Sequence, residues 1–365
     1  MPVTIKDIAR ELGVAHSTVS RAIHDDPRIS RETKQRVLEA VTRLGYRPNA
    51  AARGLVSRRI HAVGLVIPGV ADMFYGRIVD GVDRAAYEAG FGLSLYLTHG
   101  ERRRELDALA QVSERRVDGL IVMMRRSPKK VLLELAQQDI PLVLIEPQSL
   151  GLGIDSVRVD NRDGGYQAVR HLLNLGHRRI AFIAGPGGQR ESRERWQGYR
   201  QALAEAGLSY DPELVQPGDY TEAGGTAAVQ RWLQLPPARR PTAIFASNDR
   251  TAIGAVGALQ AAGVCVPQEV SVIGYDDISA AAYARPALTT IRQPIEEMGA
   301  TAARLLIDRL VQRRKSGCQE VLLKTELVVR QSTARPPEQV DEKVGEAGQA
   351  GADAADRGQA EASSA

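Results

Sequence analysis

The chain has 365 residues, of which 43% are hydrophobic and 25% charged, a composition typical of globular proteins. Its length predicts two or three domains rather than one small core. Its formal net charge is +4, and residues 1–59 hold 12 Lys and Arg against 6 Asp and Glu. Two cysteines exclude a disulfide framework, and the lack of a secretory leader or of an apolar run of about 20 residues predicts a cytoplasmic protein without a membrane span.

Residues 1–46 are basic and show the apolar periodicity of three short helices. The apolar face of the first helix consists of Ile5, Ile8, Ala9 and Leu12. The apolar face of the second consists of Val14, Val19 and Ile23. The third helix is capped by Ser30 and ends at Gly45, and its apolar face consists of Val37, Leu38, Val41 and Leu44. A basic helical module attached to a near-neutral body indicates nucleic-acid binding.

The first two helices have the spacing of a helix-turn-helix. Ala9 is small where the helices would cross, Gly13 permits a left-handed turn, and the β-branched Val19 can pack back onto the first helix. The alternative is a plain helical packing module, and the excess of positive charge argues against it. Residues 47–59, an alanine-rich stretch after Pro48, predict either a hinge helix or a flexible linker.

From His61 onward, apolar runs alternate with helical patterns. Runs of this kind include HAVGLVIP, FGLSLYLT, PLVLIE, TAIFASND and VSVIGYDD. The alternation predicts parallel sheets with helices on both faces, and the number of units predicts two Rossmann-like subdomains within residues 60–330. VLLKTELVVR is expected to be a closing strand or hairpin. Residues 331–365 contain no Leu, Ile or aromatic residue and predict a disordered tail.

The stretch from Val3 to Leu55 is similar to the head of the LacI/GalR (lactose-repressor) family over its whole length. The elements T-I-K-D-I-A, G-V-x-x-S-T-V-S-R, V-L-E-A and L-G-Y-R-P-N occur intact and in order. The resemblance implies that the second helix enters the major groove of a pseudo-palindromic duplex operator. It implies DNA contacts by the side chains of Thr4, His16, Ser17, Thr18, Ser20, Arg21 and Asn49, with Ala15 near the DNA backbone. Ala15 replaces a common Ser and loses a side-chain cap worth about 1 kcal/mol.

The resemblance extends to the hinge. Ala52 and Leu55 fall on one helical face, and in the family such a leucine wedges between base steps in the minor groove. Gly54 replaces the more usual serine and costs about 1 kcal/mol of helix propensity. This favours a hinge helix that forms only when two hinges pair on DNA.

Residues 60–330 resemble the effector-binding and dimerisation core of the same family, which is itself similar to periplasmic sugar-binding proteins. The matching stretches begin at VRVDNRDGGYQAVRHLL, ASNDRTAIGAVGAL and VSVIGYDDISAAAYARP. The resemblance implies two subdomains, with the chain crossing between them near residues 160, 291 and 320. It implies effector contacts at Arg195, Asn248 and Asp276, and Phe74, Tyr75 and Tyr220 match pocket positions in different family members. Glu146 and Asp160 are further candidates because they lie at strand ends.

Other polar residues are expected to have structural roles. Asp249 and Asp277 are interpreted as helix caps, His177 as a turn contact, and Cys265 and Cys318 as small buried thiols. GPGGQR at 185–190 lacks the third glycine of a dinucleotide loop, and the chain shows no catalytic motif. We therefore expect no enzyme activity, no cofactor and no metal.

The sequence thus predicts a DNA-binding transcriptional regulator that acts as a homodimer under the control of a small-molecule effector. We expect a repressor of a carbohydrate-utilisation operon, with a sugar or sugar derivative as effector. The rival classes are a stand-alone sugar-binding protein, which would need a signal peptide and no basic head, and an enzyme. The sign of regulation stays open, because the ligand can be an inducer such as a sugar or a co-repressor such as a purine.

Overall fold

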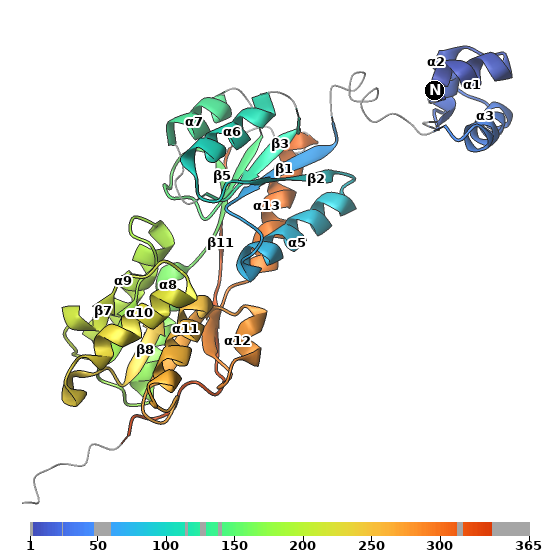
Figure 1. Cartoon of the computed structure of the whole chain (residues 1–365). Helices are drawn as coiled ribbons and strands as arrows, with labels where there is room; N and C mark the ends of the chain where they lie inside the picture. Colours follow the sequence, from blue (N-terminus) through green and yellow to red (C-terminus); the bar gives the residue numbers. More distant parts are fainter. Residues whose placement is uncertain are drawn as a thin grey trace, which may run out of the picture.

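The structure, a computed structural model, describes residues 3–23, 25–46, 60–113, 116–124, 129–137, 141–311 and 317–337. Within these residues the chain forms a small helical head and an α/β core with two sheets (Figure 1). The hinge, with the predicted DNA contacts Asn49, Ala52 and Leu55, lies outside the described residues, so those three contacts remain predictions. The helical head and the α/β core confirm the predicted fold class.

The head consists of three helices: α1 (Ile5–Leu12), α2 (His16–Ile23) and α3 (Arg31–Arg43). Gly13 ends α1 with a φ of +66°, a left-handed conformation that glycine adopts without strain. Ile8, Val19 and Val37 are completely buried and join the three helices. One expected core position is wrong: Leu38 is 50% exposed, because the inner face of α3 is formed by Val37 and Ala40.

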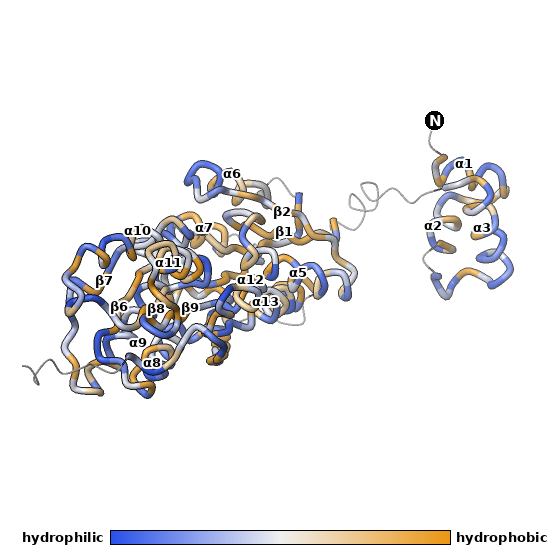
Figure 2. The backbone as a smooth tube through the Cα atoms, turned by 60° about the horizontal axis from the view of Figure 1, so that its bottom comes forward, coloured by the Kyte–Doolittle hydropathy of each residue, from blue (hydrophilic) through white to orange (hydrophobic). Residues whose placement is uncertain are grey.

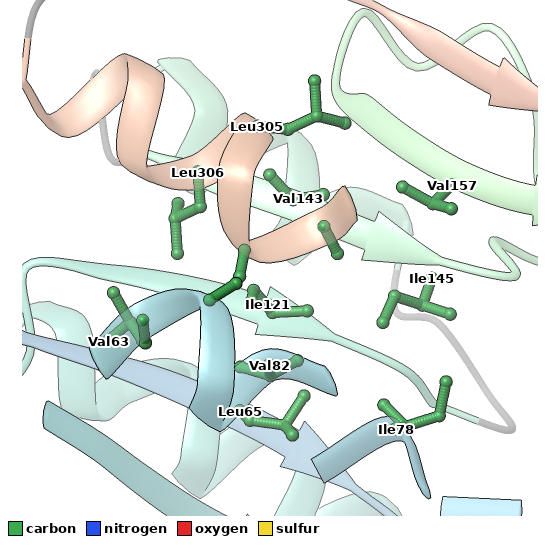
Figure 3. Close-up of a cluster of buried hydrophobic side chains, with 14 of the residues drawn as sticks. Val63, Leu65, Ile78, Val82, Ile121, Val143, Ile145, Val157, Leu305 and Leu306 are labelled. Carbon is green, nitrogen blue, oxygen red and sulfur yellow. The ribbon is translucent and has the colours of Figure 1, made fainter. Parts of the chain in front are cut away.

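The first subdomain contains a parallel sheet in the order β11-β5-β4-β3-β1-β2. Its strands are β1 (Ala62–Ile67), β2 (Gly92–Leu97), β3 (Gly119–Val122), β4 (Leu142–Ile145), β5 (Asp155–Val159) and β11 (Glu320–Leu323). Its helices are α5 (Met73–Glu88) and α13 (Ile295–Leu310) on one face, and α6 (Arg102–Ser113) and α7 (Lys129–Gln137) on the other. On the first face, Leu65 and Ile121 of the sheet meet Val82 of α5 and Leu306 of α13 (Figure 3).

The second subdomain contains a sheet in the order β12-β10-β9-β8-β6-β7, in which only β12 is antiparallel to its neighbour among the described strands. Its strands are β6 (Ile180–Ile183), β7 (Val215–Gln216), β8 (Ala243–Ala246), β9 (Ser271–Asp276), β10 (Thr289–Arg292) and β12 (Glu326–Val328). Helices α8 (Asn161–Asn174) and α9 (Arg190–Glu205) cover one face, and α10 (Glu222–Leu233) and α11 (Asp249–Ala261) cover the other. The short elements are η1 (Pro212–Leu214), η2 (Pro237–Arg239) and α12 (Ser279–Tyr283).

The chain crosses between the subdomains three times, at Asp160, after Arg292 and after Leu323. These positions agree with the crossings expected near residues 160, 291 and 320. Of the two alternatives for VLLKTELVVR, the closing strand is confirmed and the hairpin is wrong, because β11 lies at the edge of one sheet and β12 at the edge of the other. Along the helices, hydrophobic and hydrophilic residues alternate around the axis, as amphipathic helices on a sheet require (Figure 2).

Two further expectations fail. The tail does not begin at residue 331, because Ser332 is buried and its hydroxyl donates to the carbonyl of Val272 at 2.6 Å and accepts from the amide of Thr289 at 2.8 Å. Residues 331–337 therefore belong to the second subdomain, although they are polar, and residues 338–365 lie outside the described residues. The cysteines are not buried: Cys265 and Cys318 are both exposed.

Candidate functional site

A cleft of about 640 Å³, which includes open solvent, lies between the two subdomains. The predicted effector residues that line it are Phe74, Tyr75, Glu146, Arg195, Tyr220, Asn248 and Asp276. The polar lining residues that sequence reasoning missed are Asp72, Gln148, Gln189, Glu191 and Gln293. Gln148 and Gln293 follow buried strands β4 and β10, so a systematic search of polar residues at the carboxyl ends of strands could have found them.

The carboxyl ends of the parallel strands position much of this lining. Glu146 follows β4, Asn248 follows β8, and Asp276 is the last residue of β9. Three lining residues adopt positive φ angles, which are +47° at Glu146, +66° at Tyr220 and +112° at Asp276. Such angles cost about 1–3 kcal/mol each for residues other than glycine, and they cluster at functional sites because the surrounding structure holds them there.

Arg195 is the buried cation of the cleft. Its Nε donates to the side chain of Asn161 at 2.8 Å, and its Nη1 donates to the backbone carbonyl of Ser247. Its guanidinium lies 3.7 Å from the ring centroid of Tyr275, and Nη1 lies 3.9 Å from Oδ1 of Asp276. A planar guanidinium fixed from several directions can present its remaining N–H groups to a ligand with little loss of entropy.

Asp276 and Asn248 lie on the same wall. Gln293 Nε2 donates to Oδ1 of Asp276 at 2.6 Å, and burial raises the pKa of Asp276 to about 7 against the lowering effects of Arg195 and Gln293. Asn248 caps α11, since its Oδ1 accepts from the amide of Thr251 at 3.0 Å. Asn248 therefore has a structural role as well as its place in the lining.

Glu146 ties the two subdomains together through a residue that sequence reasoning missed. Its Oε1 accepts from the amide of Val159 at 2.6 Å, and its Oε2 accepts from Asn161 at 3.3 Å and from Nη2 of Arg190 at 2.7 Å. Arg190 Nε also donates to the carbonyl of Pro147 at 2.7 Å. Burial raises the pKa of Glu146 to about 7, although Arg190 opposes the shift. With both carboxylate oxygens already engaged, Glu146 positions the cleft wall.

Three other polar residues have roles that differ from the predicted ones. Asp160 does not line the cleft; it caps α8 by accepting from the amide of Asp163 at 2.9 Å. The two predicted caps are wrong, because Asp249 accepts from the amide of Ile278 at 2.9 Å and Asp277 accepts from Arg292 at 2.7 Å. His177 does not line the cleft, and its ring nitrogens contact Thr242, Ser271 and Ala334.

Two buried polar atoms beside the ligand space have no hydrogen-bond partner among the described residues. They are the hydroxyl of Tyr220 and Oε1 of Gln293. Buried polar groups are nearly always hydrogen-bonded, and leaving one unsatisfied costs about 1–3 kcal/mol. These atoms are therefore suited to polar groups of a molecule in the cleft.

The head places most of its predicted DNA contacts on one helix. On and just before α2, Ala15, His16 and Arg21 are exposed, and Ser17, Thr18 and Ser20 are half-buried. Thr4 caps α1 instead: its amide and hydroxyl donate to Asp7 at 2.9 and 2.6 Å. The hydroxyl of Thr4 can still accept a hydrogen bond, so the cap does not exclude a phosphate contact.

The comparisons with known proteins cover both parts. The profile of bacterial regulatory proteins of the lacI family matches residues 4–49, and that of the periplasmic binding protein-like domain matches residues 169–333. The chain is 36% identical over 313 residues to the HTH-type transcriptional repressor PurR of Aliivibrio fischeri (84% of this chain, 91% of PurR). It is 35% identical over 337 residues to the HTH-type transcriptional regulator DegA of Bacillus subtilis (92% of this chain, 99% of DegA).

Two solved structures are also similar. The lac repressor dimer bound to operator and the anti-inducer ONPF has a TM-score of 0.82 at 28% identity, covering 92% of this chain and 100% of that one. The complex of the transcriptional regulator CelR with cellobiose has a TM-score of 0.69 at 36% identity, covering 90% of this chain and 99% of that one.

A helix-turn-helix head joined to a two-subdomain core with a cleft defines a DNA-binding transcriptional regulator with a ligand-binding domain. The chain belongs to the lacI family of bacterial regulatory proteins. No helix in the described part of the chain is long and apolar enough to cross a membrane.

Proposed function

We propose that this chain is a cytoplasmic repressor that binds operator DNA as a homodimer and alters its hold on that DNA when a sugar binds in the cleft. The observation that carries the proposal is the convergence of Arg195 from α9, Asn248 from the start of α11 and Asp276 from the end of β9, beside the rings of Phe74 and Tyr220. The proposal includes no catalysis, since relatives over most of this length are transcriptional regulators.

The chemistry of the lining suits a polyhydroxylated ligand. A carboxylate such as that of Asp276 accepts from sugar hydroxyls, a guanidinium such as that of Arg195 donates to them, and aromatic rings cover the apolar face of the sugar. Among the charged residues that line the cleft, Arg195 is the cation, against Asp72, Glu146, Glu191 and Asp276. This balance disfavours a sugar phosphate. Two similar proteins have been solved with cellobiose and with ribose.

Regulation would follow from contacts that join the subdomains across the cleft. Arg250 of α11 lies 3.3 Å from Asp72 at the start of α5, and Arg77 of α5 donates to the carbonyl of Asp277 at 3.1 Å. A ligand that binds the closed arrangement better than the open one would shift this equilibrium and, through the dimer, the spacing of the two hinges. A ligand with equal affinity for both states would regulate nothing.

The ligand half of the proposal is tested with Asp276→Asn and Arg195→Ala. A thermal-shift screen of neutral sugars, sugar phosphates and purines on the full chain identifies a binder, and titration calorimetry then compares the variants. Each variant should bind at least tenfold more weakly, because a polar group of the ligand loses its buried partner. Both should still bind the operator without ligand. Loss of operator binding by a folded variant would contradict this assignment of the cleft.

The DNA half is tested with Arg21→Ala, because Arg21 is exposed in the last turn of α2. In vitro selection from randomised duplex DNA should enrich a two-fold symmetric site. Fluorescence anisotropy on that site at physiological salt should show Arg21→Ala weakened by about 1–3 kcal/mol. Arg178→Ala, an exposed arginine of the core, is the matched control and should bind as the parent does. Equal operator affinity of Arg21→Ala and the control would contradict the assignment of α2 as the DNA-reading helix.

A further inference from the structure

Glu191 differs from the other carboxylates of the cleft. It lies in the first turn of α9, lines the cleft and is half-buried. Its Oε2 accepts from Nε2 of Gln148, on the opposite subdomain, at 3.0 Å. Among the described residues, no arginine, lysine or histidine forms an ion pair with it. Glu191 therefore brings to the ligand space a negative charge that forms no ion pair among the described residues, although it acts at longer range on Arg195, whose pKa it helps to raise.

The three other carboxylates that line the cleft each have an arginine partner. The pairs are Asp72–Arg250 at 3.3 Å, Glu146–Arg190 at 2.7 Å and Asp276–Arg195 at 3.9 Å. Two of these arginines are shared with a second carboxylate. Arg190 also binds Glu194, and Arg250 also binds Glu222, each at 2.6 Å. Among the described residues that line the cleft, four carboxylates therefore face one guanidinium group, that of Arg195.

This surplus acts on the lining itself. Burial raises the pKa of Glu146 to about 7 against the effect of Arg190, and the negative charge of Glu191 adds to the increase. Moving a carboxylate out of water costs free energy unless a cation or several hydrogen-bond donors face it. A neutral hydroxyl supplies one donor, whereas an ammonium group supplies three donors and the missing positive charge.

We propose that the ligand of this cleft is an amino sugar whose ammonium group binds the carboxylate of Glu191. This inference rests on the proposed function, because it names the kind of sugar that the same cleft takes. The hydroxyl groups of the sugar would face Asp276, Asn248 and Arg195, as for any sugar. Glu191 then determines specificity, because its carboxylate attracts a positively charged group on the ligand and repels a phosphate or a carboxylate.

The test compares matched sugars that differ only at one nitrogen. Calorimetry at pH 7 on the full chain uses glucose, galactose and mannose, their 2-amino-2-deoxy forms, and the N-acetylated forms, which keep the nitrogen but lose the charge. We expect one amino sugar to bind at least tenfold more tightly than both its hydroxyl and its N-acetyl counterpart. Glu191→Gln should remove that preference, so that the amino sugar and its neutral counterpart bind the variant with affinities within about tenfold of each other. Glu205→Gln, on the exposed far end of α9, is the control and should keep it.

The outcomes separate this inference from the proposed function. If a neutral sugar binds as tightly as its amino form, or if Glu191→Gln keeps the preference, the inference is overturned while the cleft remains a sugar site. If no sugar of either kind binds the folded parent protein but a purine does, both statements are overturned. Circular dichroism of each variant ensures that a lost preference is not a lost fold.

Discussion

His177 lies beneath the C-terminal segment and holds it to the second subdomain. Its Nε2 lies 2.9 Å from the carbonyl oxygen of Ala334, and its Nδ1 lies 3.0 Å from the hydroxyl of Thr242. Donation from Nε2 to the carbonyl leaves Nδ1 as the acceptor, an arrangement that suits the neutral imidazole. The side chain is buried, and this burial lowers its pKa from the ordinary value near 6.5.

This lowered pKa makes a testable contribution to stability. Below about pH 6.5, His177 is protonated in the unfolded chain, whereas in the folded protein it binds a proton only at lower pH. Because the unfolded chain binds more protons in this range, the free energy of unfolding falls as the pH falls. The slope from one such group is at most about 1.4 kcal/mol per pH unit. Urea unfolding of the parent and of His177→Gln between pH 7.5 and 5 should show a shallower decline in the variant.

The comparison of slopes is needed because other groups act in the opposite direction. Glu146 and Asp276, whose pKa values are raised to about 7, bind protons more readily in the folded protein and favour it as the pH falls. Both are present in the parent and in the variant, so their effect cancels. A parent slope equal to that of His177→Gln would rule out this role.

At the scale of elements, the close contact of α8 with α9 fixes the position of Arg195. Gly165 of α8 and Gly198 of α9 lie at the contact, where a Cβ atom on Gly198 would lie 2.1 Å from the carbonyl oxygen of Arg162. A Cβ atom on Gly165 would lie 2.4 Å from the carbonyl oxygen of Arg195. Both obstacles are backbone, so any larger residue must push the helices apart.

Gly198→Ala should therefore destabilise the fold by about 1–3 kcal/mol and weaken ligand binding, because α9 carries Arg195 into the cleft. Gly257→Ala on α11 is the matched control, since a Cβ there would meet nothing within 4 Å. The control should be neutral or stabilising by up to about 1 kcal/mol, the difference in helix propensity. Thermal and urea unfolding measure both. Similar behaviour of the two alanine variants would contradict the packing argument.

The sequence predicted the order and type of the elements because strong periodicity and buried parallel strands leave a local signal. It also predicted seven of the residues that line the cleft, six through the family resemblance and Glu146 through its place at the end of a strand. It did not predict Arg190, because pairing with Glu146 joins residues from two subdomains, and no local pattern records such a contact. The misassignment of Asp249 and Asp277 has the same origin: their partners lie far along the chain.

At the scale of the whole molecule, the C-terminal boundary of the core can be tested by truncation. Ending the chain after Pro337 should change the free energy of unfolding by less than about 0.5 kcal/mol, because it keeps the whole described C-terminal segment with its contacts to the second subdomain. Ending it after Arg330 removes Ser332, whose carbonyl accepts from the amide of Val272 at 2.8 Å and whose hydroxyl accepts from Thr289. Each buried amide left unpaired costs about 1–3 kcal/mol, so this second truncation should be strongly destabilising.

The same truncations test the proposed dimer. Residues 331–365 contain no leucine and so offer no leucine-rich coil for a tetramer. Light scattering should give a dimer mass for the full chain and for the chain that ends at Pro337. A tetramer that collapses on removal of residues 338–365 would refute the proposed assembly.

The three crossings also set the order in which the protein can form during synthesis. Residues 161–292, which build most of the second subdomain, leave the ribosome as one uninterrupted stretch. The first subdomain begins earlier but needs α13 to cover one face and β11 to complete its sheet, so it cannot finish until Leu323 has been made. The second subdomain in turn needs β12 and Ser332, which are made later still, so neither subdomain is complete until the last crossing has been synthesised, and the apolar faces of β3 and β4 cannot be covered before α13 has been made.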